Sequence, residues 1–208
     1  MKPAILWVDI MNAETVLGIL LGIGLSAACG FRVFVPLLVM SIASYSGHLT
    51  LSAGFEWIGS LPALVTFAIA TFLEIAGYYI PWVDHLLDVI ATPVSVVAGI
   101  VVMASTVAGL SPFLRWALAI IAGGGIAGTF QAVTSLTRLT STATTAGFGN
   151  PVVSTIEAGG SLGLSLLAIA LPIVAAAVAL MLLALLYWPG RKLLRKLTTS
   201  PDRGPAKL

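Results

Sequence analysis

Charged residues are scarce in this chain of 208 residues. Only 9% of its residues are Asp, Glu, Lys or Arg, whereas a soluble domain carries about 25%. Hydrophobic residues make up 59% of the chain. This balance excludes an ordinary soluble fold, a disordered chain and a nucleic-acid-binding protein. It indicates an integral membrane protein whose main partner is the lipid bilayer.

Cysteine and histidine are nearly absent as well. The single cysteine, Cys29, excludes an internal disulfide framework and a zinc site built from cysteines. The two histidines, His48 and His85, fall in separate loops, and the sequence offers no nucleophile with a plausible histidine partner. The sequence also lacks a phosphate-binding glycine loop and an HExxH motif. We therefore predict no cofactor, and an enzymatic function stays open without being favoured.

Five apolar segments follow one another along the chain, and none alternates with a period of two. They cover residues 15–44, 58–80, 87–107, 112–145 and 160–188. Since a helix needs about 20 residues to cross the bilayer, this pattern predicts an all-α, polytopic membrane protein with about five transmembrane helices. Pro36, Pro93 and Pro172 are expected to kink the helices that contain them.

The charges are distributed unevenly between the ends of the chain. Residues 1–190 hold four basic and seven acidic groups, whereas residues 191–208 hold six basic groups and one acidic group. Because cytoplasmic flanks are rich in Lys and Arg, we predict a cytoplasmic C-terminus and, counting back over five spans, an N-terminus outside. This count places the loop near Arg115 in the cytoplasm and the loop from Gly147 to Glu157 outside.

A faint internal repeat divides the chain. Residues 24–32 align with 123–131, and residues 56–61 align with 157–162. Three predicted spans separate the two copies, so they should run in opposite directions, as in many transporters. The corresponding division is an N-terminal segment (1–13), a first repeat with a connecting helix (14–109), a second repeat (110–190) and a basic cytoplasmic tail (191–208). Similar composition of small-residue helices is the alternative explanation.

Glycines mark the first and fourth segments at corresponding places. We predict that these two helices are interrupted at Gly24, Gly30, Gly125 and Gly128. Interrupted helices leave backbone groups free to line a binding site. The alternative is tight packing of the two helices through their small residues.

Polar side chains within the apolar segments are the candidates for binding a solute. Arg32 lies about midway along the first segment, where a charge costs ~2.5–3.5 kcal/mol, and the repeat pairs it with Gln131. Arg138 and Ser135 share a polar stripe with Gln131 on the fourth segment. Glu74, in the second segment, is either a carboxylate reaching outer water, a proton carrier, or the partner of an arginine. The predicted binding residues are Arg32, Gln131, Glu74, Arg138 and Ser135.

Two acidic residues follow Pro81 at helical spacing. Asp84 and Asp88 fall on one face, as ligands of a divalent cation would. Two acids near the start of a helix also interact favourably with its dipole. The dipole or solvation is the favoured explanation, and a metal site is the alternative.

Three short motifs resemble a known family. They are Gly30-Phe31-Arg32, Pro81-x-x-Asp84-x-x-x-Asp88 and Gly149-Asn150-Pro151-x-x-Ser154-x-x-Glu157. In these residues the chain is similar to the small membrane proteins of the domain-of-unknown-function 4126 family, over about residues 14–186. The resemblance implies a protein of the bacterial inner membrane and adds no catalytic residue.

The sequence thus favours a transporter or channel for a small, anionic solute bound at Arg32. A structural or accessory membrane subunit is the first alternative. A magnesium-dependent enzyme acting on a lipid phosphate, through Asp84 and Asp88, is the second. A homodimer is compatible with so small a bundle.

Overall fold

The computed structural model describes residues 13–80 and 83–198, all of them in helices or the turns between helices. Most of the predicted N-terminal segment (1–13) and the last ten residues of the tail lie outside this part, as does Pro81. The elements are α2 (Ala13–Phe31), α3 (Phe34–Tyr45), the 3-10 turn η1 (Glu56–Gly59), α4 (Leu61–Gly77), α5 (Val83–Thr106), α6 (Pro112–Leu118), the π-helical segment η2 (Ala119–Gly124), α7 (Gly125–Thr145), α8 (Asn150–Ala170) and α9 (Pro172–Thr198).

Four stretches of this helical chain are long and apolar enough to cross a bilayer, among the residues described. They are Ala13–Phe31, Leu86–Thr106, Pro112–Thr145 and Asn150–Ala170. Shorter apolar helices cover Phe34–Tyr45, Leu61–Gly77 and Pro172–Leu185. The chain is therefore an all-helical, multi-pass membrane protein. Its described residues contain four helical stretches long and apolar enough to span a bilayer and three shorter apolar helices, where the sequence predicted about five similar spans.

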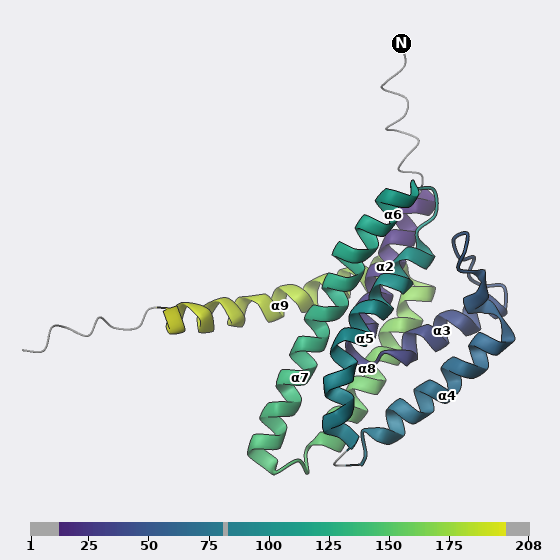
Figure 1. The fold of residues 1–208 in the computed structure, drawn as a ribbon. Coiled ribbons are helices and arrows are strands. Elements are labelled where there is room, and N and C mark those ends of the chain that lie inside the picture. The colour runs from purple at the N-terminus through teal and green to yellow at the C-terminus, as the bar shows by residue number, and fades with distance from the viewer. Residues whose placement is uncertain (1–12, 81–82, 199–208) are drawn as a thin grey trace, which may run out of the picture.

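The first apolar segment is two helices. α2 ends at Phe31 and α3 begins at Phe34, in a new direction (Figure 1). Pro36 explains the break, because it has no N–H to bond the carbonyl of Arg32 and its ring would collide with that carbonyl. Arg32 therefore lies at the end of a helix about 28 Å long, and the prediction that placed it midway along one long helix is wrong.

The last apolar segment is also divided, and it begins earlier than predicted. α8 starts at Asn150, so the predicted outer loop 147–157 is a short turn followed by two turns of helix. Ala146 and Gly147 have φ of 51° and 89° and reverse the chain. α8 then stops at Ala170, and Pro172 opens α9 in another direction. Pro93, in contrast, lies within a continuous α5.

Small residues bring α2, α5 and α7 into close contact. A Cβ on Gly18 or Gly22 of α2 would collide with Thr106 or Met103 of α5. Farther along α5, a Cβ on Gly99 would lie 2.6 Å from the Gly123 carbonyl. Glycine at these positions lets helix backbones approach closely.

The predicted break residues mostly serve this packing. Gly24 is inside an unbroken α2, against Ala168 and Ala175. Gly128 is inside α7, and Gly125 is its first residue, at the end of the π segment. Gly30 lies in the last turn of α2, just before the break at Arg32. The first and last apolar segments break near Pro36 and Pro172. The predicted break glycines, in contrast, lie within helices or at a helix start.

The contacts also determine the directions of the helices. α2 runs antiparallel to α5, because Gly18, Gly22 and Ser26 approach Thr106, Met103 and Gly99 in that order. α7 is antiparallel to α5 as well, since Gly123 approaches Met103 and Gly128 approaches Val96. α2 and α7 are therefore parallel, and the stretches 24–32 and 123–131 do not run in opposite directions as predicted.

This arrangement also changes the predicted topology. The Thr15 hydroxyl donates to the Ala108 carbonyl at 3.0 Å, so the start of α2 lies beside the loop that precedes Arg115. The sequence placed these two points on opposite sides of the membrane. The physical reason for the difference is the break at Arg32, after which α3 leads back towards the same end. There Ser52 N donates to the Ser105 carbonyl at 2.8 Å.

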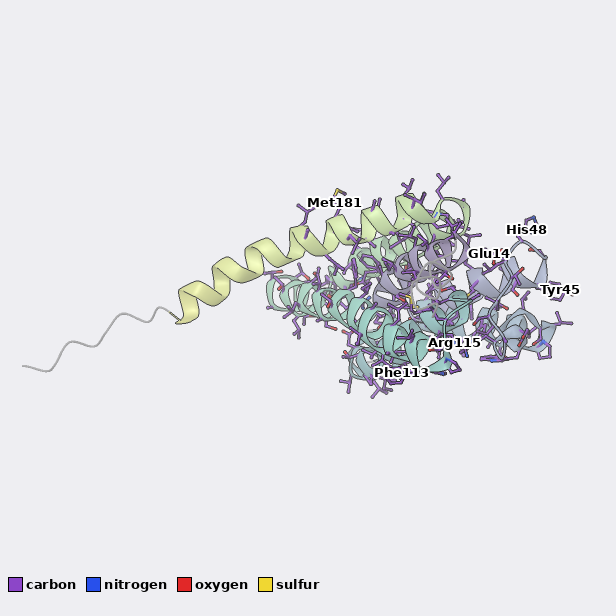
Figure 2. All side chains as sticks on the ribbon, turned by 90° about the horizontal axis from the view of Figure 1, so that it is seen from above. Glu14, Tyr45, His48, Phe113, Arg115 and Met181 are labelled. Atoms are coloured by element: carbon purple, nitrogen blue, oxygen red, sulfur yellow. The ribbon has the colours of Figure 1, made fainter. Side chains whose placement is uncertain are left out.

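The last helix leaves the bundle. The first turns of α9 pack on α2 through Ala175 and Ala179, and the helix then extends sideways away from the other helices (Figure 1). The view from above shows Met181 on this projecting helix, whereas Arg115 and His48 lie on the bundle (Figure 2). The predicted cytoplasmic tail begins as a continuation of this helix to Thr198.

Candidate functional site

Charged side chains from five helices or their ends gather inside the bundle. Arg32 is 1% exposed, Arg138 3%, Glu157 5% and Glu74 7%. They come from the end of α2, from α7, from α8 and from α4, and Asp88 joins them from α5. Charges buried in a membrane protein are costly unless they are paired. The contacts of this cluster therefore decide what it can do.

Arg32 is bound from α8. Its Nη2 donates to the Ser154 carbonyl at 3.0 Å and to the Ser154 hydroxyl. The same nitrogen lies 3.4 Å from Oε2 of Glu157. Ser154 and Glu157 are three residues apart and share one face of α8. Arg32 thus joins the break after α2 to α8, a helix more than 120 residues later in the chain.

Arg138 and Glu157 form the closest ion pair of the cluster. Arg138 Nε donates to Glu157 Oε1 at 3.2 Å, and Nη2 donates to Oε2. Two parallel bonds of this kind match the planar fork of the guanidinium to the carboxylate. Oε2 of Glu157 therefore forms ion pairs with both arginines. Asp88 Oδ1 lies 3.7 Å from Arg138 Nε on another side.

Tyr78 directly follows α4, and its ring contacts both arginines. The Cζ atoms of Arg32 and of Arg138 are each 3.9 Å from the centre of its ring, and Tyr78 is 5% exposed. A guanidinium over an aromatic face gains about 2 kcal/mol when both groups are desolvated. The structure places its ring in the interior, against two charges.

Glu74 caps the broken helix. Its Oε1 accepts from Val33 N at 2.8 Å, and its Oε2 accepts from Phe34 N at 3.0 Å. The first N–H groups of a helix lack partners within the helix, and a carboxylate there also meets the positive end of the helix dipole. Glu74 is therefore held by the start of α3, in the position that an anionic ligand would take at a free helix end.

Arg32 keeps unused donors. Its Nε and Nη1 are buried and have no hydrogen-bond partner among the described residues. A buried guanidinium with unsatisfied N–H groups loses the hydrogen bonds that it makes in water. These donors can be satisfied by a water molecule or by an oxygen of a bound solute.

The cluster does not carry a net positive formal charge. Two guanidiniums, Arg32 and Arg138, contact the carboxylates of Glu157 and Asp88, and Glu74 caps the helix start that follows Arg32. With all five groups ionised the cluster carries a formal charge of −1. The sequence predicted that Arg32 binds an anionic solute, whereas the tertiary structure brings carboxylates to both arginines.

The other predicted binding residues lie beside the cluster. Gln131 is buried, with its backbone N close to Gly30, and its Nε2 donates to the Ser135 hydroxyl at 3.4 Å. Gln131 and Ser135 thus bond to each other within α7. Arg32, Glu74 and Arg138 are brought together by the fold, whereas Gln131 and Ser135 extend the polar stripe away from them along the helix.

The predicted metal pair is only partly described. The side chain of Asp84 lies outside the described residues, and Asp88 faces Arg138. Among the described residues, the structure has no group of three or more His, Cys, Asp or Glu side chains that could hold a metal ion. Asp88 therefore takes part in the charged cluster.

The hydroxyl-rich end of α7 forms a shallow groove with α8. Its volume is about 650 Å³, and Thr137, Thr140, Thr144 and Thr145 line it. These hydroxyls donate to the carbonyl four residues earlier, as is common for Thr in membrane helices. Their donors are satisfied, so this groove carries less chemistry than its composition indicates.

The central role of Glu157 and Ser154 was not predicted from the sequence. Glu157 was placed at the end of an outer loop, and Ser154 was named only within a motif. One signal was available: Asn150, Ser154, Glu157 and Ser161 recur every three or four residues, and all four are buried. That periodicity predicts a helix with a polar inner face. The choice of a loop up to Glu157 concealed it.

The comparison with protein families identifies the chain. The model of the family described as "Domain of unknown function (DUF4126)" matches residues 19–192. No curated protein and no solved structure matches the chain. The matched range contains every residue of the charged cluster, the greater part of α2, all helices from α3 to α8 and the greater part of α9. The chain therefore belongs to the DUF4126 family, as the resemblance of its three motifs implied.

Proposed function

We propose that this protein is a transporter or channel for a small anionic solute, with Arg32 at its binding centre. The observation that carries the proposal is the pair of buried nitrogens of Arg32, Nε and Nη1, that lack partners among the described residues. A carboxylate or phosphate-like oxygen is the acceptor that suits a guanidinium best. The other nitrogen, Nη2, is held by Ser154 and Glu157, so the side chain is already oriented.

The broken helix supports the same proposal. α2 and α3 meet at Arg32 and Val33, within the apolar part of the chain. Within a membrane, helices are interrupted where the backbone lines a cavity or is buried in protein. Transporters bind their solutes at such interruptions. Here the helix start is capped by Glu74, and Arg32 lies next to the cap in sequence.

The charge of the cluster constrains the mechanism. An anion added to a cluster of formal charge −1 is disfavoured unless a positive charge enters with it. We therefore propose that the anion moves together with a cation, and a proton taken up by a cluster carboxylate is the simplest case. The overall process would then transfer little net charge across the membrane.

Flux measurements in liposomes test the proposal. Uptake of chloride, nitrate, phosphate and short carboxylates should be compared for the wild type, Arg32→Gln and Arg115→Gln. Arg115 is a matched control, because it is also an arginine but lies outside the cluster. We expect at least one anion to enter, faster with an inward proton gradient, and Arg32→Gln alone to abolish entry. Absence of flux for every anion, with folded protein in the vesicles, would reject the proposal and leave a structural role for the cluster.

A further inference from the structure

Asp88 differs from the other members of the charged cluster in its exposure. Its side chain is 24% exposed, whereas those of Arg138 and Glu157 are 4% and 6% exposed. Arg32 and Glu74 are buried as well. Asp88 is therefore the carboxylate of this cluster that a proton from the surroundings of the protein reaches most easily.

The position of Asp88 along α5 places it near a boundary of the membrane. At the other end of α5, Ser52 N of the loop after α3 donates to the Ser105 carbonyl, so polar loops meet there. Such loops belong at the membrane surface, because lipid cannot satisfy their backbone groups. From Asp88 to Thr106 the helix rises about 27 Å, close to the ~30 Å thickness of the hydrocarbon core. Asp88 therefore lies near the opposite boundary, within reach of water.

The other two carboxylates of the cluster hold structural elements together. A proton on Glu157 would remove the charge that Arg32 and Arg138 share. A proton on Glu74 would compete with the two backbone N–H groups that this carboxylate accepts from the start of α3. A proton on Asp88, in contrast, leaves Arg138 with its ion pair to Glu157. Asp88 is thus the carboxylate that can be neutralised while the cluster keeps its other contacts.

The surroundings of Asp88 connect it to the arginines. Its Oδ1 lies 3.7 Å from Nε of Arg138, which faces it from α7. Tyr78, directly after α4, interacts with the charge of Asp88 and lies against both guanidiniums. The titratable residues Asp84 and His85 precede Asp88 on α5, and their side chains lie outside the described residues. A change of charge at Asp88 therefore acts first on Arg138 and on Tyr78.

From this geometry we infer that Asp88 is the carboxylate that takes up the proton entering with the anion. The inference rests on the proposed transport at Arg32. The carboxylate of Asp88 gains one proton from water when the anion binds, and it returns that proton to water when the anion leaves. With Asp88 neutral, the formal charge of the cluster rises from −1 to 0, so an anion at Arg32 meets less repulsion.

Flux measured together with the internal pH of liposomes tests the inference. The probe is whichever of chloride, nitrate, phosphate and short carboxylates the wild type takes up fastest, after subtraction of uptake by protein-free vesicles. A pH-sensitive dye inside the same vesicles reports the proton. For the wild type we expect uptake to rise by up to about tenfold per unit fall in outside pH, as one proton per anion requires, and the interior to become acidic with it.

Variants of Asp88 separate the proton from the anion. Asp88→Asn has the shape of the protonated acid and cannot exchange a proton, so its anion uptake should be independent of pH and should not acidify the interior. Asp88→Glu retains an acid and should retain the pH response, with a shifted midpoint. Glu56→Gln is the control, because Glu56 is exposed and lies in the turn that precedes α4, outside the cluster. It should behave as the wild type does.

The outcomes distinguish this inference from the proposed transport. A pH response and acidification that persist in Asp88→Asn would overturn the inference and leave the transport of anions at Arg32 intact. Loss of uptake at every pH in folded Asp88→Asn would assign Asp88 a structural role and would overturn it as well. If Asp88→Asn fails to fold, an unchanged midpoint in Asp88→Glu would contradict the inference. Absence of uptake by the wild type would reject both proposals.

Discussion

Arg138 and Glu157 face each other between α7 and α8, with Arg138 Nε 3.2 Å from Glu157 Oε1 and both side chains at most 6% exposed. The same carboxylate contacts Arg32 at 3.4 Å. One buried acid therefore holds two arginines that lie more than 100 residues apart in the chain. This relationship makes Glu157 the residue on which the cluster depends most.

Replacing Glu157 should destabilise the protein strongly. Glu157→Gln leaves two buried guanidiniums without their shared carboxylate, and breaking a buried ion pair costs about 3–5 kcal/mol. The free energy of unfolding, measured by denaturant titration in detergent, gives the effect. Glu56→Gln is the control, since Glu56 is exposed and bonds Gly54 N in a turn, so its change should stay within about 0.5 kcal/mol. Equal effects of the two variants would contradict this account of the cluster.

Removing the charge of Glu74 should loosen the start of α3. Gln has one acceptor oxygen where Glu74 uses two, so one of the Val33 and Phe34 amides loses its partner. We expect about 1–2 kcal/mol of lost stability and faster hydrogen exchange at these two amides, measured by mass spectrometry on peptides that cover residues 30–38. Glu14→Gln, in the exposed first turn of α2, should leave that exchange unchanged. Protection at Val33 and Phe34 that survives in Glu74→Gln would show that α3 does not need this cap.

The ring of Tyr78 should matter more than its hydroxyl. Tyr78→Phe keeps an aromatic face against both guanidiniums, whereas Tyr78→Leu removes it. The Leu variant should be less stable than the Phe variant by about 1–2 kcal/mol, measured as the difference in unfolding free energy in one detergent. If the Leu variant matched the Phe variant, the stacking of the arginines would contribute nothing beyond ordinary packing.

Two helical glycines, Gly30 and Gly125, should respond in opposite ways to substitution by alanine. A Cβ on Gly30 would collide with Cβ of Phe130 and lie 2.6 Å from the Ala127 carbonyl oxygen, whereas a Cβ on Gly125 meets nothing within 4 Å. Gly30→Ala should therefore lower the midpoint of thermal unfolding, with an overpacking cost of about 1–3 kcal/mol. Gly125→Ala should raise the midpoint slightly, since Ala favours a helix by about 1 kcal/mol over Gly. A stabilised Gly30→Ala variant would show that α2 and α7 can separate at this point without loss.

Much of the fold follows from local patterns. The scarcity of charge and the long apolar segments predict a helical membrane protein, and Pro36 and Pro172 by themselves indicate where two of its helices break. Arg32, Glu74 and Arg138 were likewise singled out, because a charge in an apolar helix demands a partner. Each of these inferences needs only a residue and its neighbours in sequence.

Other features depended on contacts between distant residues. The predicted topology assumed that each apolar segment crosses the membrane once. Because α3 turns back after Arg32, the start of α2 lies on the same side as the loop that precedes Arg115. Glycine composition predicted helix breaks at Gly24, Gly125 and Gly128, but whether a glycine loosens a helix or admits a neighbouring one depends on what lies beside it. Gly24 lies against Ala168 and Ala175, some 150 residues away, which local sequence cannot show.

The sequence by itself determined that this protein is helical and lies in a lipid bilayer. It also determined which few polar residues need hydrogen-bond or charge partners inside the protein. Only the tertiary structure decided how they are satisfied: Glu157 is shared by Arg32 and Arg138, and Glu74 caps α3. The physical reason is that hydrophobicity and proline geometry act over a few residues. Charge pairing in a medium without water, in contrast, is decided by whichever side chains the packed helices bring within hydrogen-bond distance.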